Sequence, residues 1–302
     1  LEGEPIDNIP MKIAISSSTE LSFAIPVNED GFISLLENNI ISIFAFLPTL
    51  VKDFVFPFYI NANFILDSPR QRVLGDSAWN IYLFKILADK IVDWSIDLSK
   101  RQDRNALNIL PYKKFDESSP DISLLAKAFN DAYLYAISNK AFILNEEGDF
   151  AKQEDIIIDK SGLSDMIGYE GFYKILGTSK RLVSSILDSK VLSNSLFSEI
   201  EIVNEEFILN LLENEINIKS IYNELNEEDF NGLLSWLSNI PDVSDGIINN
   251  LPIFSDGEDI LSFNELEANN SIVLTEKTSP IKQILHLSST YKCNFLGADN
   301  KQ

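Results

Sequence analysis

The chain has little of the chemistry on which most metal centres and redox enzymes depend. Among its 302 residues there is one cysteine, Cys293, and one histidine, His286. A single cysteine excludes an intrachain disulfide, which fits a reducing compartment. The same shortage excludes zinc sites built from several Cys and His ligands and any centre that needs two histidines. We therefore expect no metal site in this chain.

Basic residues are also scarce, with 24 Lys and Arg against 46 Asp and Glu and a formal net charge of −22. Nucleic-acid binding depends on Lys and Arg side chains that neutralise phosphates, so we expect no broad nucleic-acid surface. The densest acidic run lies between Glu199 and Asp229. It is either the solvated face of helices or a surface for a basic partner.

Long apolar runs are absent as well. No window reaches 18 consecutive apolar residues, so the sequence predicts no membrane span. The N-terminus has no basic region followed by an apolar one, so we expect no secretory signal. Together with the lone cysteine, these features indicate a cytoplasmic protein. The chain starts at Leu1 rather than at methionine, which favours a piece of a longer protein.

What the sequence does contain is a mixture of short β-prone runs and amphipathic helices, which predicts an α+β (mixed α/β) fold. We expect a sheet-and-helix domain over residues 1–110 and a more helical domain with β-hairpins over 111–302. The polar segment 100–119, which contains Pro111, is interpreted as a linker or a long loop. The expected early strands cover residues 12–16, 21–27, 32–35, 40–47 and 58–66.

Two helices are indicated by their periodicity. The first follows Ser77 or Asp76 as its cap, extends to about residue 100, and places Asn80 on its polar face. The second starts at Ser119 as its N-cap, with Pro120 in the first turn. Residues 161–240 are expected to be mainly helical, with one late helix opened by 226–229. The expected apolar faces comprise Leu83, Leu87, Ile91, Trp94 and Leu98 in the first helix and Ile122, Leu125, Phe129, Tyr133 and Ile137 in the second.

Three hairpins of similar design follow from an acidic Gly turn between apolar runs, at 28–31, 145–149 and 255–259. Catalytic motifs are missing: there is no Walker loop, dinucleotide glycine fingerprint or Gly-x-Ser-x-Gly elbow. His286 is expected to be a hydrogen-bonded, half-buried residue rather than a base, and Cys293 a small buried residue rather than a nucleophile. The acidic run 256–259 is interpreted as a turn and not as a calcium loop.

The most unusual stretch is residues 57–72, where a strand ends in a turn that presents two arginines just before a helix. Arginine is a planar fork of donors that matches phosphate oxygens, so Arg70 and Arg72 are candidate phosphate-contacting residues. Asn61 and Asn63 lie two residues apart on the preceding strand and would share a face, which makes them weaker candidates for cofactor binding. Structural salt bridges are the alternative role for the arginines.

These residues carry a resemblance to the sacsin family. Residues 42–48, 56–70 and the pair Trp79-Asn80 resemble the Phe-Leu-Pro strand, the Ile-Asn-Gly-x-Phe stretch with its terminal arginines, and the Trp-Asn helix start of sacsin repeats. The match covers about residues 20–100. The family histidine is Tyr59 here, and the family glycine is Ala62. Sacsin-type repeats belong with the ATPase superfamily of heat-shock protein 90, gyrase, histidine kinases and MutL.

The resemblance implies a segment just downstream of a nucleotide-binding domain, because the superfamily's nucleotide motifs lie N-terminal to this stretch and none is in this chain. In heat-shock relatives this region supplies an arginine that reaches the γ-phosphate. Arg70 is the best positional match and Arg72 the alternate. The parent protein would then use ATP and Mg²⁺, and this chain alone would hold no cofactor.

The favoured function is therefore the middle region of a sacsin-like, heat-shock-protein-90-like ATPase that acts as a chaperone or an ATP-driven conformational switch. Its expected partners are the upstream ATPase domain of the same protein and protein clients, and the resemblance leaves room for a homodimer of the parent. The alternative is a non-catalytic scaffold or protein-interaction module. A free-standing hydrolase is disfavoured because nucleophile and metal ligands are missing.

Overall fold

A computed structural model describes residues 20–37, 41–213, 215–241, 243–252, 254–255, 260–268 and 286–287. Helix accounts for 45% of these residues and strand for 13%, which confirms the mixed α+β fold. Within these ranges no helix combines the length and the apolar character that a membrane crossing requires. The chain divides into two compact units. The first comprises Leu1–Ile157 and Arg181–Glu201, and the second Ile158–Lys180 and Ile202–Gln302.

The first unit contains a four-stranded sheet in the order β1-β4-β2-β3. Its strands are β1 (Ser22–Ala24), β2 (Ile43–Ala45), β3 (Leu47–Pro48) and β4 (Tyr59–Asn61). β4 is antiparallel to β1 and parallel to β2, and β2 is antiparallel to β3. The single strand expected over 40–47 is wrong. Phe46 adopts a positive φ of 61°, and the chain folds back so that Leu47 pairs with Ala45.

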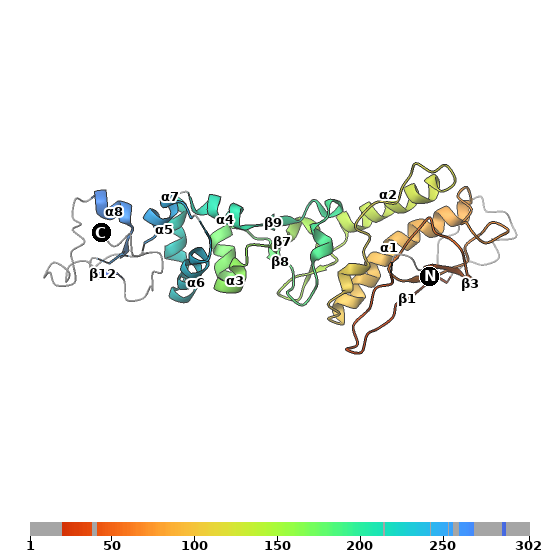
Figure 1. Ribbon diagram of the computed structural model, residues 1–302, viewed down its shortest axis with the longest axis horizontal. Coiled ribbons are helices and arrows are strands. Elements are labelled where there is room, and N and C mark those ends of the chain that lie inside the picture. Colours follow the sequence, from red (N-terminus) through yellow and green to blue (C-terminus); the bar gives the residue numbers. More distant parts are fainter. Residues whose placement is uncertain are drawn as a thin grey trace. The chain divides into compact units, whose positions relative to one another are not determined.

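Helix α1 (Ala78–Lys100) packs on one face of this sheet (Figure 1). Ser77 accepts a hydrogen bond from the N–H of Asn80 and caps the first turn, as the sequence predicts. Trp94 stacks on Phe23 of β1, with 5.1 Å between the ring centroids, and meets Phe58 edge-on. Aromatic pairs of this kind join the helix to the sheet through the core of the unit.

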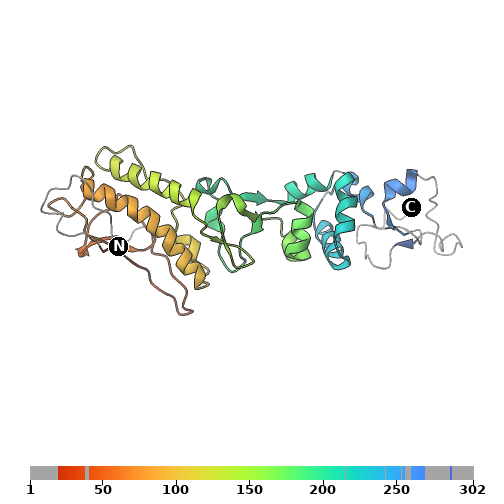
Figure 2. The same ribbon diagram turned by 180° about the vertical axis from the view of Figure 1, so that it is seen from behind.

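Helix α2 (Ser123–Asn139) runs beside α1 in both views (Figures 1 and 2). All five residues of its expected apolar face are buried. The expected N-cap at Ser119 is wrong, because the helix begins at Ser123 with Ile122 in the cap position. The carbonyl of Ser119 accepts hydrogen bonds from the N–H groups of Ile122 and Ser123, so Ser119 to Ile122 form a separate turn before the helix.

The segment 100–119 belongs to the first unit throughout. It contains the short 3₁₀ helix η1 (Ala106–Ile109) and buries Ala106, Leu107, Ile109 and Leu110. The division between two domains that we expected at residues 110 and 111 thus falls inside one compact unit, between two helices that pack on each other. These four buried residues anchor the segment in the core of the first unit.

The first two glycine turns form as the sequence predicts. Gly31 has a φ of 87° beside the antiparallel bridge between Val27 and Ile33, and Gly148 has a φ of 89°. The second hairpin pairs β5 (Ile143–Leu144) with β6 (Phe150–Ala151), and the third pairs β10 (Phe254–Ser255) with β11 (Ile260–Leu261). Also present are β7 (Ile156–Asp159), which is parallel to β8 (Arg181–Leu182), and the 3₁₀ helices η2 (Gln153–Asp155), η3 (Lys190–Ser193) and η4 (Ser195–Phe197).

The second unit is mainly helical. Its elements are α3 (Leu163–Leu176), α4 (Glu205–Leu212), α5 (Glu215–Glu224), α6 (Glu227–Ser238), α7 (Asp245–Asn250), α8 (Phe263–Ala268) and β12 (His286–Leu287), together with β10 and β11. Strand β9 (Glu201–Val203) starts at the last residue of the first unit and continues into the second. α6 packs so closely on α3 that a Cβ at Gly232 would collide with the carbonyl oxygen of Met166. Asn226 caps α6 and confirms the predicted late helix.

Several sequence predictions lie outside the described residues. These are the strand over 12–16, the turn over 256–259 and the environment of Cys293. The main chain of His286 belongs to β12, but the surroundings of its side chain are likewise outside the description.

Candidate functional site

The two candidate arginines lie on a short hairpin between β4 and α1. Leu66 and Val73 form its antiparallel bridge. At its tip, the Oδ1 atom of Asp67 accepts hydrogen bonds from the N–H groups of Gln71 (2.7 Å) and Arg72 (3.1 Å). A carboxylate that holds two main-chain donors makes the turn stiff. The hairpin therefore fixes the main chain from which the arginine side chains extend.

Arg70 folds back on the sheet. Its φ is 57°, which is uncommon for a residue with a side chain. Its Nη2 atom donates hydrogen bonds to the carbonyl oxygens of Ala45 (2.9 Å) and Leu47 (3.3 Å), on either side of Phe46. The buried Nε atom has no hydrogen-bond partner among the described residues. Arg70 thus holds the bend between β2 and β3.

An open pocket of ≈ 460 Å³ lies beside this guanidinium. Arg70, Ser68 and Asn63 supply polar groups to its lining, and Phe46 and Phe64 supply apolar ones. Arg70 is only partly buried, so the pocket is a place where an external anion can approach it. Asp67 also lines the pocket, but its carboxylate already accepts two main-chain hydrogen bonds.

Arg72 points elsewhere and forms an ion pair with Asp121, in the turn before α2. The side chains of Arg72 and Asp121 are 60% and 64% exposed. An exposed pair of this kind is worth at most about 1 kcal/mol. Arg72 thus forms a salt bridge, which is the alternative to phosphate contact that the sequence left open. The structure does not bring Arg70 and Arg72 to a common ligand position.

The two asparagines are also separated. The Oδ1 atom of Asn61 accepts a hydrogen bond from the N–H of Phe46 at 3.0 Å, so this side chain stabilises the bend. Asn63 lies beyond the end of β4, and it is one of the residues that line the Arg70 pocket. Its carbonyl oxygen accepts from Nε1 of Trp79 at 2.8 Å. Asn63 is thus the one asparagine that shares a pocket with Arg70.

Asn80 is a positioning residue that the periodicity placed on the wrong face of its helix. It is fully buried at the start of α1, not exposed as expected. Its Oδ1 atom accepts from the N–H of Ile65 at 2.9 Å, and its Nδ2 atom donates to the carbonyl oxygens of Ile65 (2.7 Å) and Leu74 (2.9 Å). Asn80 therefore ties both arms of the arginine hairpin to α1. The sequence signal for this role of Asn80 was the Trp79-Asn80 pair, which resembles the Trp-Asn helix start of sacsin repeats.

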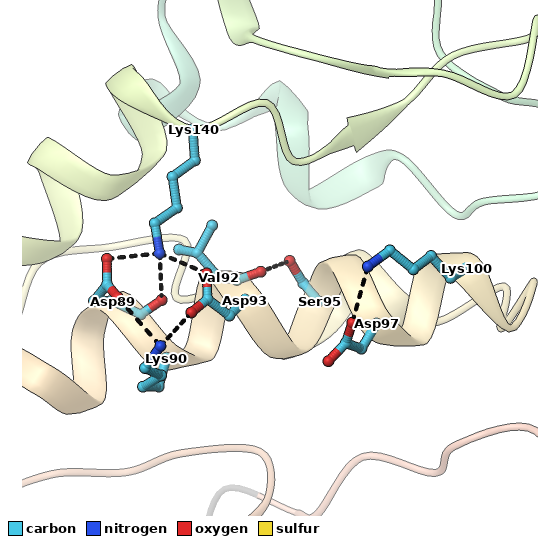
Figure 3. A network of polar contacts seen from close by, with 8 residues as sticks. All are labelled: Asp89, Lys90, Val92, Asp93, Ser95, Asp97, Lys100 and Lys140. Carbon is cyan, nitrogen blue, oxygen red and sulfur yellow. Dashed lines mark hydrogen bonds and ion pairs between the residues drawn. The ribbon is translucent and has the colours of Figure 1, made fainter. Parts of the chain in front are cut away.

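A second polar cluster in the first unit joins α1 to the end of α2 (Figure 3). The Nζ atom of Lys140 lies 2.6 Å from carboxylate oxygens of both Asp89 and Asp93, and Lys90 contacts Asp93 from the other side. Burial raises the pKa of Asp93, but hydrogen bonds and charge from Lys140 and Lys90 outweigh it, so the pKa is lowered. Burial likewise lowers the pKa of Lys140, but Asp89 and Asp93 outweigh it and raise it.

This lysine network is a structural clamp, because each charge in it is already neutralised by a partner. In the described part of the chain, no group of three or more His, Cys, Asp or Glu side chains is placed to bind a metal ion. Comparisons with protein-family models, with curated proteins and with solved structures find no match to the chain.

Proposed function

We propose that this chain is the segment downstream of the nucleotide-binding domain in a sacsin-like, heat-shock-protein-90-like ATPase of the cytoplasm. In that protein, which acts as a chaperone or conformational switch, Arg70 contacts the terminal phosphate of Mg-ATP bound to the preceding domain. The observation that carries the proposal is a partly exposed arginine on a braced hairpin, at the edge of an open pocket.

The present partners of Arg70 are compatible with this role. Its Nη2 atom donates to two neutral carbonyl oxygens, and such hydrogen bonds are weaker than those to phosphate. A phosphate that reaches the pocket meets an arginine whose main chain is already fixed by Asp67 and Asn80. Preorganised donors of this kind stabilise developing charge in phosphoryl transfer.

The test is steady-state ATP turnover in the complete gene product. A contact to a charged group is worth about 1.5–3 kcal/mol, so Arg70→Ala should lower turnover about 10- to 100-fold. Arg70→Lys keeps the charge but loses the fork, and we expect it to recover only part of the rate. Arg72→Ala should have little effect, and Arg101→Ala, which removes another exposed arginine of the same unit, is the matched control.

Two outcomes contradict the proposal. One is unchanged turnover in Arg70→Ala and Arg70→Lys, when Arg101→Ala is also unchanged. The other is micromolar binding of Mg-ATP by the 302-residue chain alone in a calorimetric titration, since the proposal places the pocket in another domain.

The second candidate is a non-catalytic scaffold or protein-interaction module. It is favoured by exposed apolar side chains at the bend between β2 and β3, where Phe46 is 79%, Leu47 63% and Leu50 52% exposed. Large apolar side chains gathered on one exposed segment mark interaction sites. Unchanged turnover, or absence of ATPase activity in the gene product, supports this candidate.

A further inference from the structure

Two large apolar side chains lie exposed on helix α3 of the second unit. Met166 is 43% and Tyr169 40% exposed. Gly168, which lies between them, has a φ of 71° and a ψ of 169°, outside the helical region, and breaks the helix at this point. Within residues 165–170 only Ile167 is buried. The break thus interrupts the regular division of an amphipathic helix into a buried and a solvated face, and both apolar side chains remain in solvent.

Helix α6 lies against this part of α3 (Figure 1). The two helices approach each other at glycines. A Cβ at Gly232 would collide with the carbonyl oxygen of Met166, and a Cβ at Gly171 would lie 3.1 Å from the carboxylate of Asp229. Packing this close leaves the two helices little room to slide past each other. Residues 165–170 of α3 and 227–229 of α6 therefore form one fixed surface, which we call the α3–α6 face.

Acidic side chains accompany the apolar pair on the α3–α6 face. Glu170 is exposed beside Tyr169, and Glu228 is exposed in the first turn of α6. Burial raises the pKa of the Asp229 carboxyl. The charge of Lys174 opposes this shift, but the charges of Glu228 and Glu170 add to it. One carboxylate from each helix thus acts on the same third carboxylate. Helix dipoles favour acidic residues in a first turn, but they give no reason for apolar side chains in solvent beside them.

We infer that the α3–α6 face is a docking surface for a basic amphipathic helix of another protein. The apolar side chains of that helix cover Met166 and Tyr169, and its Lys or Arg side chains meet Glu170 and Glu228. Charge complementarity selects this partner, because a row of cations beside apolar groups matches carboxylates beside exposed Met and Tyr side chains. Methionine adapts to the shape of the group that covers it, and tyrosine is enriched among the residues that contribute most to interfaces.

A second copy of the chain is a poor occupant, since two chains of net charge −22 repel each other. The C-terminal end of the acidic run between Glu199 and Asp229 is then a surface for a basic partner. The α3–α6 face belongs to the second unit, so its role does not depend on that of Arg70.

The test is fluorescence anisotropy of a labelled synthetic helix, with leucine on one face and lysine on the other, titrated with the 302-residue chain at physiological salt. Met166→Ser and Tyr169→Ser should each weaken binding about tenfold, as expected for apolar groups at the centre of an interface. Tyr169→Phe keeps the ring and should bind like the wild type. Phe207→Ser is the matched control and should leave binding unchanged, because Phe207 of α4 is 42% exposed beside the exposed Glu205 and Glu206.

Charge reversal provides a readout that partial unfolding does not imitate. Glu170→Lys combined with Glu228→Lys should lower the preference for the lysine peptide over a counterpart with glutamate in place of lysine. The reduction should be at least about tenfold larger than in Glu205→Lys combined with Glu206→Lys, which makes the same change in net charge on α4.

Four outcomes overturn the docking surface. The first is equal binding of a peptide of the same composition whose leucines are spread around the helix, since net charge alone then explains the attraction. The second is equal weakening in Tyr169→Ser and Phe207→Ser, and the third is an equal effect of the two charge reversals. The fourth is a lowered melting temperature in Met166→Ser and Tyr169→Ser, which would assign both side chains to packing, whereas exposed docking residues should leave it unchanged.

Discussion

At the scale of single residues, Asn80 and Arg70 show how side chains replace regular secondary structure. The sheet ends at Asn61, and the hairpin that follows has one bridge. The hydrogen bonds that an additional strand would supply come instead from the amide of Asn80 and the guanidinium of Arg70. Because main-chain groups depend on these side chains, both residues affect stability as well as any function of the site.

Asn80→Ala should destabilise the first unit by about 1–3 kcal/mol, since it removes the three hydrogen bonds of a fully buried side chain and leaves the N–H of Ile65 without its acceptor. Asn80→Asp should be intermediate, because it keeps the acceptor for the N–H of Ile65 and loses the donor. Thermal melting followed by circular dichroism measures both. Asn139→Ala, which removes an exposed side-chain hydrogen bond to Tyr135, is the control and should change stability by less than about 0.5 kcal/mol. Equal effects at the two sites would contradict the role of Asn80.

The side chain of Arg70 is also more constrained by hydrogen bonds than the sequence suggested. An arginine exposed at a turn would be expected to leave folding unaffected when replaced. With hydrogen bonds from Nη2 to Ala45 and Leu47, Arg70→Ala should instead loosen the bend and lower the melting temperature. Because Arg70→Ala also loosens the bend, ATP turnover should be measured in both Arg70→Lys and Arg70→Ala.

At the scale of elements, the pair α1 and α2 depends on a buried apolar interface and on the Lys140 clamp at its edge. The clamp is pH-dependent. The lowered pKa of Asp93 means that its contribution is complete above its usual value of 3.8 and is lost as the pH falls through the folded value. The raised pKa of Lys140 means that its contribution is complete below its usual value of 10.5 and is lost as the pH rises further.

Lys140→Met should therefore lower stability by about 1 kcal/mol at neutral pH, and by less at acid pH below the lowered pKa of Asp93, where the wild type has lost the same contact. Urea unfolding from pH 2 to pH 7 measures this difference. Lys100→Met removes an exposed ion pair with Asp97 on α1, and we expect it to change stability less than Lys140→Met at every pH. A Lys140→Met effect that does not depend on pH would show that packing of the lysine stem, not its charge, stabilises the contact.

At the scale of the whole molecule, the two compact units do not divide the chain where its composition changes. The polar segment 100–119 lies within the first unit, and the chain leaves that unit after Ile157 and returns to it at Arg181. A composition shift marks solvent exposure, whereas a boundary between compact units depends on which buried surfaces meet. Helices α1 and α2 meet across this segment.

Trypsin should accordingly cut at the exposed residues Lys113 and Lys114 without separating α1 from α2. The nicked pieces should elute together in size-exclusion chromatography under native conditions and separate only in denaturant, because the buried interface between the helices remains. Two pieces that elute independently and melt cooperatively would support the division near residue 110 that the sequence predicts.

Sequence patterns were sufficient to predict the features that depend on neighbours along the chain. The spacing of Leu83, Leu87 and Ile91 predicted α1 and its buried face, the caps at Ser77 and Asn226 marked helix starts, and the glycine at 148 marked a hairpin. These signals are local, since a cap or a turn needs only the next few residues. The mixed α+β fold follows from them.

The environment of the candidate site depends on contacts between residues that are far apart in the sequence. Arg70 bonds to a carbonyl 25 residues away, Arg72 pairs with a residue 49 positions away, and Asn80 is buried because the hairpin covers the start of α1. The bend at Phe46 likewise depends on Asn61 and Arg70, which reach it from other elements. Local sequence patterns do not show which distant groups come into contact. Those contacts decide whether an arginine or an asparagine in or beside this hairpin is exposed, paired or buried.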